Sequence, residues 1–279
     1  MKITVGIPSR DRPLELAAAI LSLDKTKSGG HEIEFIIGHD HNDGRTVEVV
    51  SQLVAMGLPV RSSFGPRPTG LGEIHNRLIG ETEADSPFLL WSDRLVSADM
   101  QWDHGIAMTV LEFPTRVIWF DSHHLVGPGQ FILPPRWRKA LGRENPTPGI
   151  YPYWFEDTAV EELDALVHGF PRVALHQKAA GPRTAKTTRC RDLHFWIDVF
   201  AATRVDRIRQ AKKIAKALGI PPRDNTEVMT YVTMRDADFH SRADELMERY
   251  GAPGDPDPSY IEAKERAYWV LRDLEKAAA

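Results

Sequence analysis

Three apolar runs in the first hundred residues end abruptly in charged or amide side chains. They occur in ITVGIPSRDRP, EFIIGHDHNDGRT and PFLLWSDRLV, and a further acidic pair follows aromatic residues in YWFEDTAVEEL. In an open α/β sheet the carboxyl ends of the strands share one edge, and ligands bind in the crevice outside it. The pattern therefore predicts that these side chains converge on one enzyme site.

The elements that must position them alternate regularly. We expect strands at 2–7, 32–38, 58–62 and 87–91, with amphipathic helices at 13–23, 45–56 and 69–80 between them. This order favours right-handed crossovers and a mainly parallel sheet.

The second half of the chain is less regular. A helix at 102–112 and an apolar run at 117–120 precede a segment broken by glycine and proline. Thr158 and Glu161 have capping-box spacing, which predicts a helix over 158–167 with Asp157 just before its first turn. Long helices are expected at 192–218, 226–250 and 259–276.

Composition is that of a soluble globular protein. The 279 residues are 42% hydrophobic, and no apolar run approaches the roughly 20 residues of a membrane span. The strand at the N-terminus leaves no apolar stretch for a signal peptide, so we expect a cytoplasmic protein, in the host cytoplasm if it is viral. Cys190 is the only cysteine and is expected to be a packing residue.

Charge is distributed unevenly. The net charge is −4, yet residues 172–216 hold 12 Lys and Arg against 3 Asp and Glu, leaving −13 for the rest. A basic segment can attract a polyanion such as DNA, and a solvated helix face is the commoner explanation.

In their order, these motifs resemble those of nucleotide-sugar-dependent glycosyltransferases of the GT-A fold, of the large inverting family-2 type. In that family a first strand ends in proline, a polar residue and arginine or asparagine, as in VGIPSRDRP, and a second strand ends in an acidic loop, as in IIGHDHNDGRT. The resemblance covers residues 1–180. It implies an α/β, Rossmann-like GT-A domain with a mixed, mainly parallel sheet flanked by helices. Residues 1–100 would be its donor half, residues 101–180 its acceptor half, and residues 181–279 a helical C-terminal extension packed on it.

The resemblance assigns the first two strand ends to the donor, with a UDP-sugar as the expected nucleotide-sugar. Pro8, Ser9 and Arg10 would form the floor beside the base and ribose. Asp40 would accept the ring N–H of the base, with Asp43 as the alternative. An Asx turn explains either aspartate equally well, because HNDG is a strong turn sequence.

The segment GPRPTGLGEIHNRL resembles the family's glycine-containing loop and the helix that follows it. Gly70 and Gly72 would allow close backbone approach, and the N-terminus of the helix would offer N–H groups to a diphosphate. Arg67 could pair with phosphate or be an exposed loop residue. Asn76 lies one helical turn further on and faces either the crevice or the solvent.

The next strand of the family ends in an Asp-x-Asp motif, which holds Mg²⁺ or Mn²⁺ against the donor's diphosphate. Here Ser92 and Asp93 stand at the matching positions, so only one aspartate remains. Either Asp93 binds the metal with a later residue such as His176 or His194, or Arg94 partly replaces the charge of the cation.

The motif YWFEDTAVEEL resembles the family's Glu-Asp motif. Asp157 would be the base that deprotonates the acceptor hydroxyl in an inverting single displacement, with Glu156 as its neighbour. Trp154, Tyr153 and Trp137 could stack on the acceptor, and burial in the core explains them equally well.

The basic segment makes a hydroxymethylated base in DNA, as modified by certain phage glycosyltransferases, the favoured acceptor. Polysaccharide, protein and small-molecule acceptors stay open. A nucleotidyltransferase is a rival reading, although PSRDRP lacks the glycines of its usual loop, and a non-catalytic nucleotide-sugar-binding module is another. His123 and His124 are expected to have a structural or acceptor-side role.

Overall fold

The computed structural model describes residues 1–97, 99–120, 130–142, 149–176, 179–181, 190–251 and 254–278. The chain forms two compact units. Unit 1 comprises Met1–Pro68, Ile74–Arg143 and Pro171–Arg183, and unit 2 comprises Thr69–Glu73, Glu144–Phe170 and Thr184–Ala279. His123 and His124 lie outside the described residues.

Unit 1 is built on a seven-stranded sheet with the strand order β3-β2-β1-β4-β7-β6-β8. The strands are β1 (Lys2–Pro8), β2 (Glu32–Asp40), β3 (Val60–Gly65), β4 (Phe88–Leu90), β6 (Ile118–Phe120), β7 (Phe131–Leu133) and β8 (Val173–Leu175). Strand β7 runs antiparallel to β4 and β6, and the other neighbours pair in parallel. This mixed, mainly parallel sheet confirms the predicted fold class. A separate antiparallel pair joins β5 (Val96–Ser97) to β9 (Ala179–Ala180).

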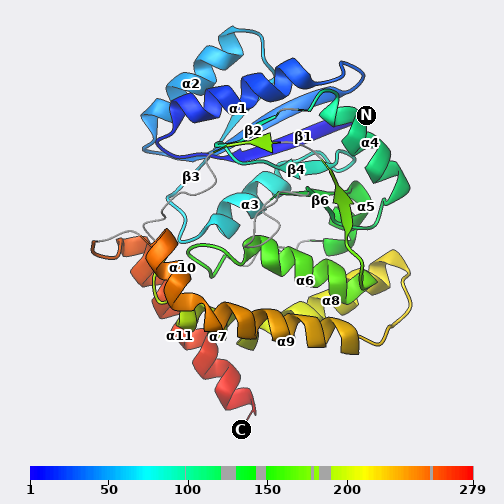
Figure 1. Cartoon of the computed structure of the whole chain (residues 1–279). Coiled ribbons are helices and arrows are strands. Elements are labelled where there is room, and N and C mark those ends of the chain that lie inside the picture. Colours follow the sequence, from blue (N-terminus) through cyan, green and yellow to red (C-terminus); the bar gives the residue numbers. More distant parts are fainter. Residues whose placement is uncertain are drawn as a thin grey trace. The chain divides into compact units, whose positions relative to one another are not determined.

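Helices cover both faces of the sheet. Figure 1 shows α1 (Pro13–Thr26) and α2 (Gly44–Ala55) on one face and α3 (Leu71–Gly80) on the other. The central strand β1 is therefore an almost continuous buried run, as expected for a parallel strand covered on both sides. At Gly38 on β2 a Cβ atom would lie 2.6 Å from Ile74 Cγ2, so glycine lets α3 approach the sheet closely. Unit 1 also contains α4 (Trp102–Glu112) and α5 (Pro135–Leu141).

Unit 2 is helical. Its elements are α6 (Glu156–His168), α7 (Leu193–Ala202), α8 (Arg204–Leu218), α9 (Thr226–Ser241), α10 (Ala243–Tyr250) and α11 (Pro258–Ala278), together with the first turn of α3. The C-terminal helices are thus present as predicted. No helix in the described part of the chain is long and apolar enough to cross a membrane.

The predictions of single long helices at 192–218 and 226–250 are wrong, because each segment forms two helices with one break between them. The first breaks at Thr203, whose hydroxyl donates to the carbonyl of Val199 and is also bonded to the Tyr151 hydroxyl at 2.8 Å. The second breaks at Arg242, with φ −110° and ψ 4°. Neither break contains glycine or proline, so the sequence lacked the residues that usually end a helix.

The predicted capping box at the start of α6 is also wrong. The helix begins at Glu156, two residues before Thr158, and its N-cap Phe155 makes no side-chain capping bond. Trp154 and Phe155 adopt φ angles of 52° and 63°, and this left-handed pair sets the direction in which the helix begins. Asp157 consequently lies inside the first turn and not before it.

Candidate functional site

The carboxyl ends of β1, β2 and β4 lie side by side at one edge of the unit 1 sheet. Strand β1 pairs with both neighbours, and Pro8 at its end is in register with Gly38. The amide of Ser9 then donates to the carbonyl of Gly38 at 2.9 Å, which holds the start of the following loop against β2. The parallel ladder therefore brings together the first, second and fourth strand ends.

The loop after β1 contacts the acidic residues of both neighbouring strands. Arg10 Nη1 lies 2.9 Å from Asp40 Oδ2, and Arg12 Nη1 lies 2.7 Å from Asp93 Oδ1. Asp11 between them has a φ of 52°, a left-handed conformation that costs energy in a residue other than glycine. The structure thus brings Arg10, Asp40 and Asp93 to one edge and adds Arg12.

Asp93 and Asp40 are each 2% exposed, and in the described ranges the Oδ2 atom of each is buried without a well-aligned hydrogen bond. The Oγ atom of Ser9, at the end of β1, is also buried without a well-aligned hydrogen bond in the described part of the chain, but Ser9 lies close enough to Asp93 to favour its charged form. Burial raises the pKa of Asp93 above its ordinary value, and the charge of Arg12 opposes this only in part. A buried carboxylate oxygen with an open acceptor position is suited to bind a cation or a ligand donor.

Arg94 does not form the ion pair with Asp93; among the described residues that partner is Arg12. The Arg94 amide lies 3.3 Å from Ser92 Oγ, and Leu95 N donates to the Ser92 carbonyl at 3.2 Å. These bonds turn the chain sharply after β4. The positive charge next to the single aspartate is therefore supplied mainly by a residue that the sequence did not single out.

Asp43 has a structural role at the N-terminus of α2. Its carboxylate accepts from Thr46 N at 3.1 Å, from Thr46 Oγ1 at 2.6 Å and from Asp11 N at 3.0 Å. Burial alone, the largest single effect, would raise the pKa of Asp43, but these bonds together lower it below its ordinary value. Asp43 is thus an N-cap, whereas Asp40 points to Arg10.

The first turn of α3, where we predicted a diphosphate to bind, belongs to unit 2 and contains the carboxylate of Glu73. Glu73 Oε1 accepts from Thr69 Oγ1 at 2.5 Å and from Arg266 Nη2 at 3.2 Å. A Cβ on Gly70 would lie 1.7 Å from the carbonyl oxygen of Tyr151, so this glycine allows close backbone packing. The space beside Gly70 is therefore filled by the protein's own backbone at Tyr151 and Pro152.

The remaining residues of the predicted phosphate loop lie in varied surroundings. Gly72 is buried, Arg67 is exposed, and Asn76 is half-buried. Arg67 and Asn76 belong to unit 1, whereas Gly70 and Gly72 belong to unit 2.

The predicted base lies in the first turn of α6 in unit 2. Asp157 is half-buried, and its Oδ1 accepts from Thr158 N at 2.8 Å. Glu156 beside it is 3% exposed. The two acidic residues directly follow the left-handed pair Trp154 and Phe155, and such strained backbone is concentrated at functional sites.

The three predicted stacking residues differ in exposure. Trp137 on α5 is fully buried, and Tyr153 is 3% exposed with its hydroxyl donating to the Arg191 carbonyl. Trp154 retains exposed surface and packs edge-on against Tyr250 at 5.5 Å between ring centroids. Of the three, Trp154 alone presents part of its ring to solvent.

The residues proposed to share a metal with Asp93 come from both units. His176 is exposed after β8 in unit 1. His194 belongs to unit 2, where its Nε2 lies 3.2 Å from Asp244 Oδ1 and its Nδ1 lies 3.0 Å from His240 Nδ1. No cluster of three or more His, Cys, Asp or Glu suited to a metal is present in the ranges that the structure describes.

Cys190 is buried, and burial raises the pKa of its thiol to about 12. The thiol stays protonated at neutral pH, as expected for a packing residue.

Part of the basic segment is buried against acidic residues of unit 2. Glu162 Oε1 accepts from Arg204 Nε at 2.9 Å and Arg207 Nε at 3.0 Å, and its Oε2 accepts from Arg235 Nη2 at 2.9 Å. Arg207 also stacks over the ring of Phe200 at 3.9 Å. We call Glu162 with these three arginines the arginine cluster. Residues 172–216 therefore do not form a single solvated basic face.

No protein-family model matches the chain, and no curated protein matches its sequence. Solved structures are similar in fold. TarS from S. aureus in complex with UDP-GlcNAc aligns with a TM-score of 0.53 and 14% identity, over 97% of this chain and 82% of that one. A mannosyltransferase from Pyrobaculum calidifontis, in complex with GDP-Man and Mn²⁺, aligns with a TM-score of 0.54 and 12% identity, over 98% and 82%. The chain thus has a GT-A-like fold, as the sequence motifs predicted.

Proposed function

We propose that this protein is a nucleotide-sugar-dependent glycosyltransferase. The observation that carries the proposal is the pair of ion pairs Arg10–Asp40 and Arg12–Asp93 at the carboxyl edge of a GT-A-like sheet. Open α/β sheets bind their ligands at this edge. The complexes of TarS with UDP-GlcNAc and of the mannosyltransferase with GDP-Man add support, because both neighbours carry nucleotide-sugars.

We assign donor binding to unit 1. Asp40 is to accept the ring N–H of the base after Arg10 moves aside, and Pro8 and Ser9 form the floor beside it. The guanidinium of Arg12 is to neutralise part of the diphosphate charge as the leaving group departs. A UDP-sugar is the expected donor, and a GDP-sugar is the alternative.

Asp93 fits a hard divalent cation through Oδ2, which has no well-aligned hydrogen bond in the described ranges, because such ions prefer carboxylate oxygens and complete their shell with substrate phosphates and water. Asp93 would hold Mn²⁺ or Mg²⁺, which stabilises negative charge on a leaving diphosphate. Arg12 would share that task. We leave His194 out of the assignment, since it is bonded to His240 and Asp244.

We assign proton removal to Asp157 in unit 2. Its carboxylate is to take the proton of the acceptor hydroxyl as that oxygen attacks the anomeric carbon, while the bond to the nucleotide diphosphate breaks. One base without an enzymic nucleophile corresponds to a single displacement with inversion. Trp154, with its exposed ring surface, is the proposed stacking residue for the acceptor.

We do not extend the proposal to DNA as the acceptor. Arg204 and Arg207, two of the basic residues on which that expectation rested, are engaged in the arginine cluster. A gel-shift measurement with duplex DNA at low salt tests this choice, and we expect weak binding without preference for modified bases.

The first test is donor binding and hydrolysis. We expect one of UDP-, GDP-, CMP- or dTDP-sugars to raise the melting temperature, with a larger shift in the presence of Mn²⁺. Slow release of free sugar from that donor would separate an enzyme from a pure binding module. Absence of a shift with every donor would contradict the proposed function.

A further inference from the structure

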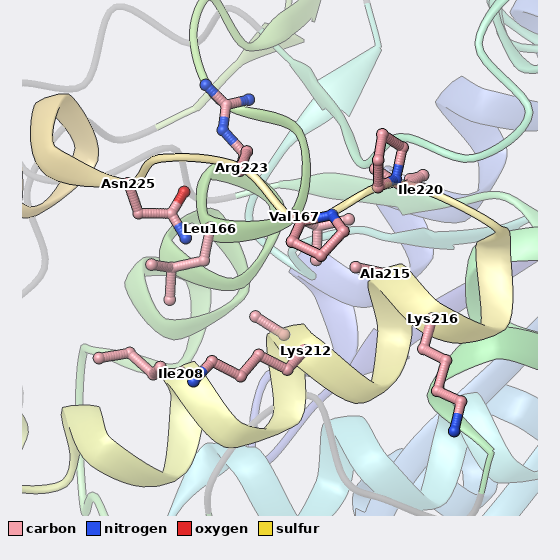
Figure 2. A pocket seen from close by; sticks show the side chains of 12 residues that line it. Leu166, Val167, Ile208, Lys212, Ala215, Lys216, Ile220, Arg223 and Asn225 are labelled. Carbon is pink, nitrogen blue, oxygen red and sulfur yellow. The ribbon is translucent and has the colours of Figure 1, made fainter.

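Unit 2 contains a pocket of about 560 Å³ that the proposed sugar transfer does not use. Figure 2 shows its walls, with α8 on one side, the end of α6 on another and the segment that follows α8 closing it. A volume of this size is within the range of small-molecule sites.

The wall of this pocket is mainly apolar. Leu166 and Val167 come from α6, Ile208 and Ala215 come from α8, and Ile220 comes from the following segment. An apolar wall of this kind favours a hydrocarbon chain or ring, because burying it removes apolar surface from water.

The rim of the pocket is positive. Lys212, Lys216 and Arg223 line it, and in the described ranges no ion pair joins either lysine to an acidic side chain, whereas the charge of Arg223 acts on the neighbouring Asp224. The Arg223 guanidinium packs over Gly169, where a Cβ would lie 2.0 Å from Arg223 Nη1. This packing holds the Arg223 guanidinium at Gly169, and Figure 2 shows Arg223 and Lys216 pointing to different sides of the pocket. Lys212 and Lys216 lie one turn apart on α8, and their exposed, flexible side chains can turn toward a ligand.

A further polar group lacks a partner. Asn225 lines the same pocket, and its Oδ1 atom is buried without a hydrogen bond within the described part of the chain. A buried acceptor of this kind calls for a donor, which a ligand or its bound water can supply.

We propose that this pocket binds a free single-chain amphiphile with an anionic head group, such as a medium-length fatty acid. The apolar wall takes the hydrocarbon chain, and the exposed side chains of Lys212 and Lys216, one turn apart on α8, turn to the carboxylate. Leu166 is nine residues from Asp157 on α6, about 14 Å along the helix axis, so this site is separate from the first turn that carries the proposed base. The proposal does not depend on the sugar-transfer assignment.

Calorimetric titration with octanoate, decanoate and dodecanoate tests the proposal. We expect at least one of them to bind, with decanol at least tenfold weaker and acetate without measurable affinity. Failure of all three to bind overturns the proposal, and so does equal affinity for decanol. Binding to anionic vesicles without binding to the monomeric acids would instead indicate a membrane-surface site and also overturn it.

Variants locate the site. Ala215→Phe should fill the pocket and reduce decanoate affinity at least tenfold, whereas Ala217→Phe, exposed on the same helix and outside the lining, should leave it unchanged. Lys212→Gln with Lys216→Gln removes only exposed charge, and it should weaken decanoate about tenfold while leaving decanol unaffected. Decanoate affinity within twofold of the parent in both variants would overturn the proposal, with circular dichroism as the check on folding.

Discussion

Two buried carboxylates, one in each unit, have pKa values that are shifted in opposite directions. Glu162 is 1% exposed and receives hydrogen bonds from three arginines, whereas Asp93 is 2% exposed and, among the described residues, forms an ion pair with one arginine, Arg12, with weaker effects from Ser9 and Arg94. Burial is the largest effect on both. In Glu162 the arginines nevertheless lower the pKa, whereas in Asp93 burial prevails and raises it. A fully satisfied carboxylate indicates a structural role, and a half-satisfied one at a sheet edge indicates a place for a ligand.

The largest effect is expected at Glu162. Replacing it with Gln leaves Arg204, Arg207 and Arg235 around a neutral side chain, and breaking a buried ionic network in this way costs about 3–5 kcal/mol. Urea denaturation should show this loss in the free energy of unfolding. The matched control is Glu248→Gln, an exposed residue on α10, which should change stability by no more than about 0.5 kcal/mol.

Asp93→Asn should have the converse effect, a large loss of activity with little change in stability. We expect turnover to fall at least about 100-fold, a cost of about 2.7 kcal/mol in the transition state, because the charge that we propose to hold the cation and donor is lost. Stability should change by less than about 1 kcal/mol, since Asn relieves the burial of a charge. Asp85→Asn, at an exposed carboxylate in unit 1, is the activity control. If Asp93→Asn destabilised the protein as much as Glu162→Gln, the contrast between the two sites would fail.

The pH dependence of stability should have opposite signs at the two sites. The folded pKa of Asp93 is raised above 3.8, so its contribution is fully present below that value and is lost as pH rises through the folded pKa. The folded pKa of Glu162 is lowered below 4.5, so its contribution is present above that value and is lost as pH falls through the folded pKa.

Unfolding free energies of the parent, Asp93→Asn and Glu162→Gln, measured between about pH 3 and 7, check this prediction. The difference between parent and Glu162→Gln should grow as pH rises. The difference between parent and Asp93→Asn should shrink or reverse over the same interval. Parallel curves would mean that the two carboxylates are in equivalent surroundings.

The smallest effect is expected at Asp43, a carboxylate satisfied by hydrogen bonds without a cation. Asp43→Ala removes the acceptor of Thr46 N and Asp11 N, and loss of an N-cap costs about 1 kcal/mol. Asp43→Asn should retain most of that energy, as a thermal melt of the two variants would show. A loss as large as that of Glu162→Gln would mean that Asp43 does more than cap α2.

Local patterns predicted the fold of unit 1 well. The β-branched run of β1 and Pro13 at the first turn of α1 are short-range signals, and they locate the strand ends from which Arg10, Asp40 and Asp93 project. Parallel pairing then brings those ends to one edge. This part of the candidate site could therefore be predicted from sequence.

The contacts between residues far apart in the sequence could not be predicted in this way. SRDRP contains two arginines, and the left-handed Asp11 decides which of them contacts Asp93. Arg235 is separated from Glu162 by 73 residues, and no local pattern connects them. The basic segment looked like a polyanion site for the same reason, because the sequence does not show that Arg204 and Arg207 are neutralised by a residue of another helix.

The short loop after β1 has a thermodynamic consequence. Only Asp11 separates Arg10 from Arg12, so a nucleotide that displaces Arg10 from Asp40 also alters the backbone that holds Arg12 on Asp93. Under the proposed function, occupancy at Asp40 and cation binding at Asp93 are then linked, and each must change the affinity of the other by the same factor. A reciprocal shift of that kind would make the loop a coupling element between base recognition and charge neutralisation.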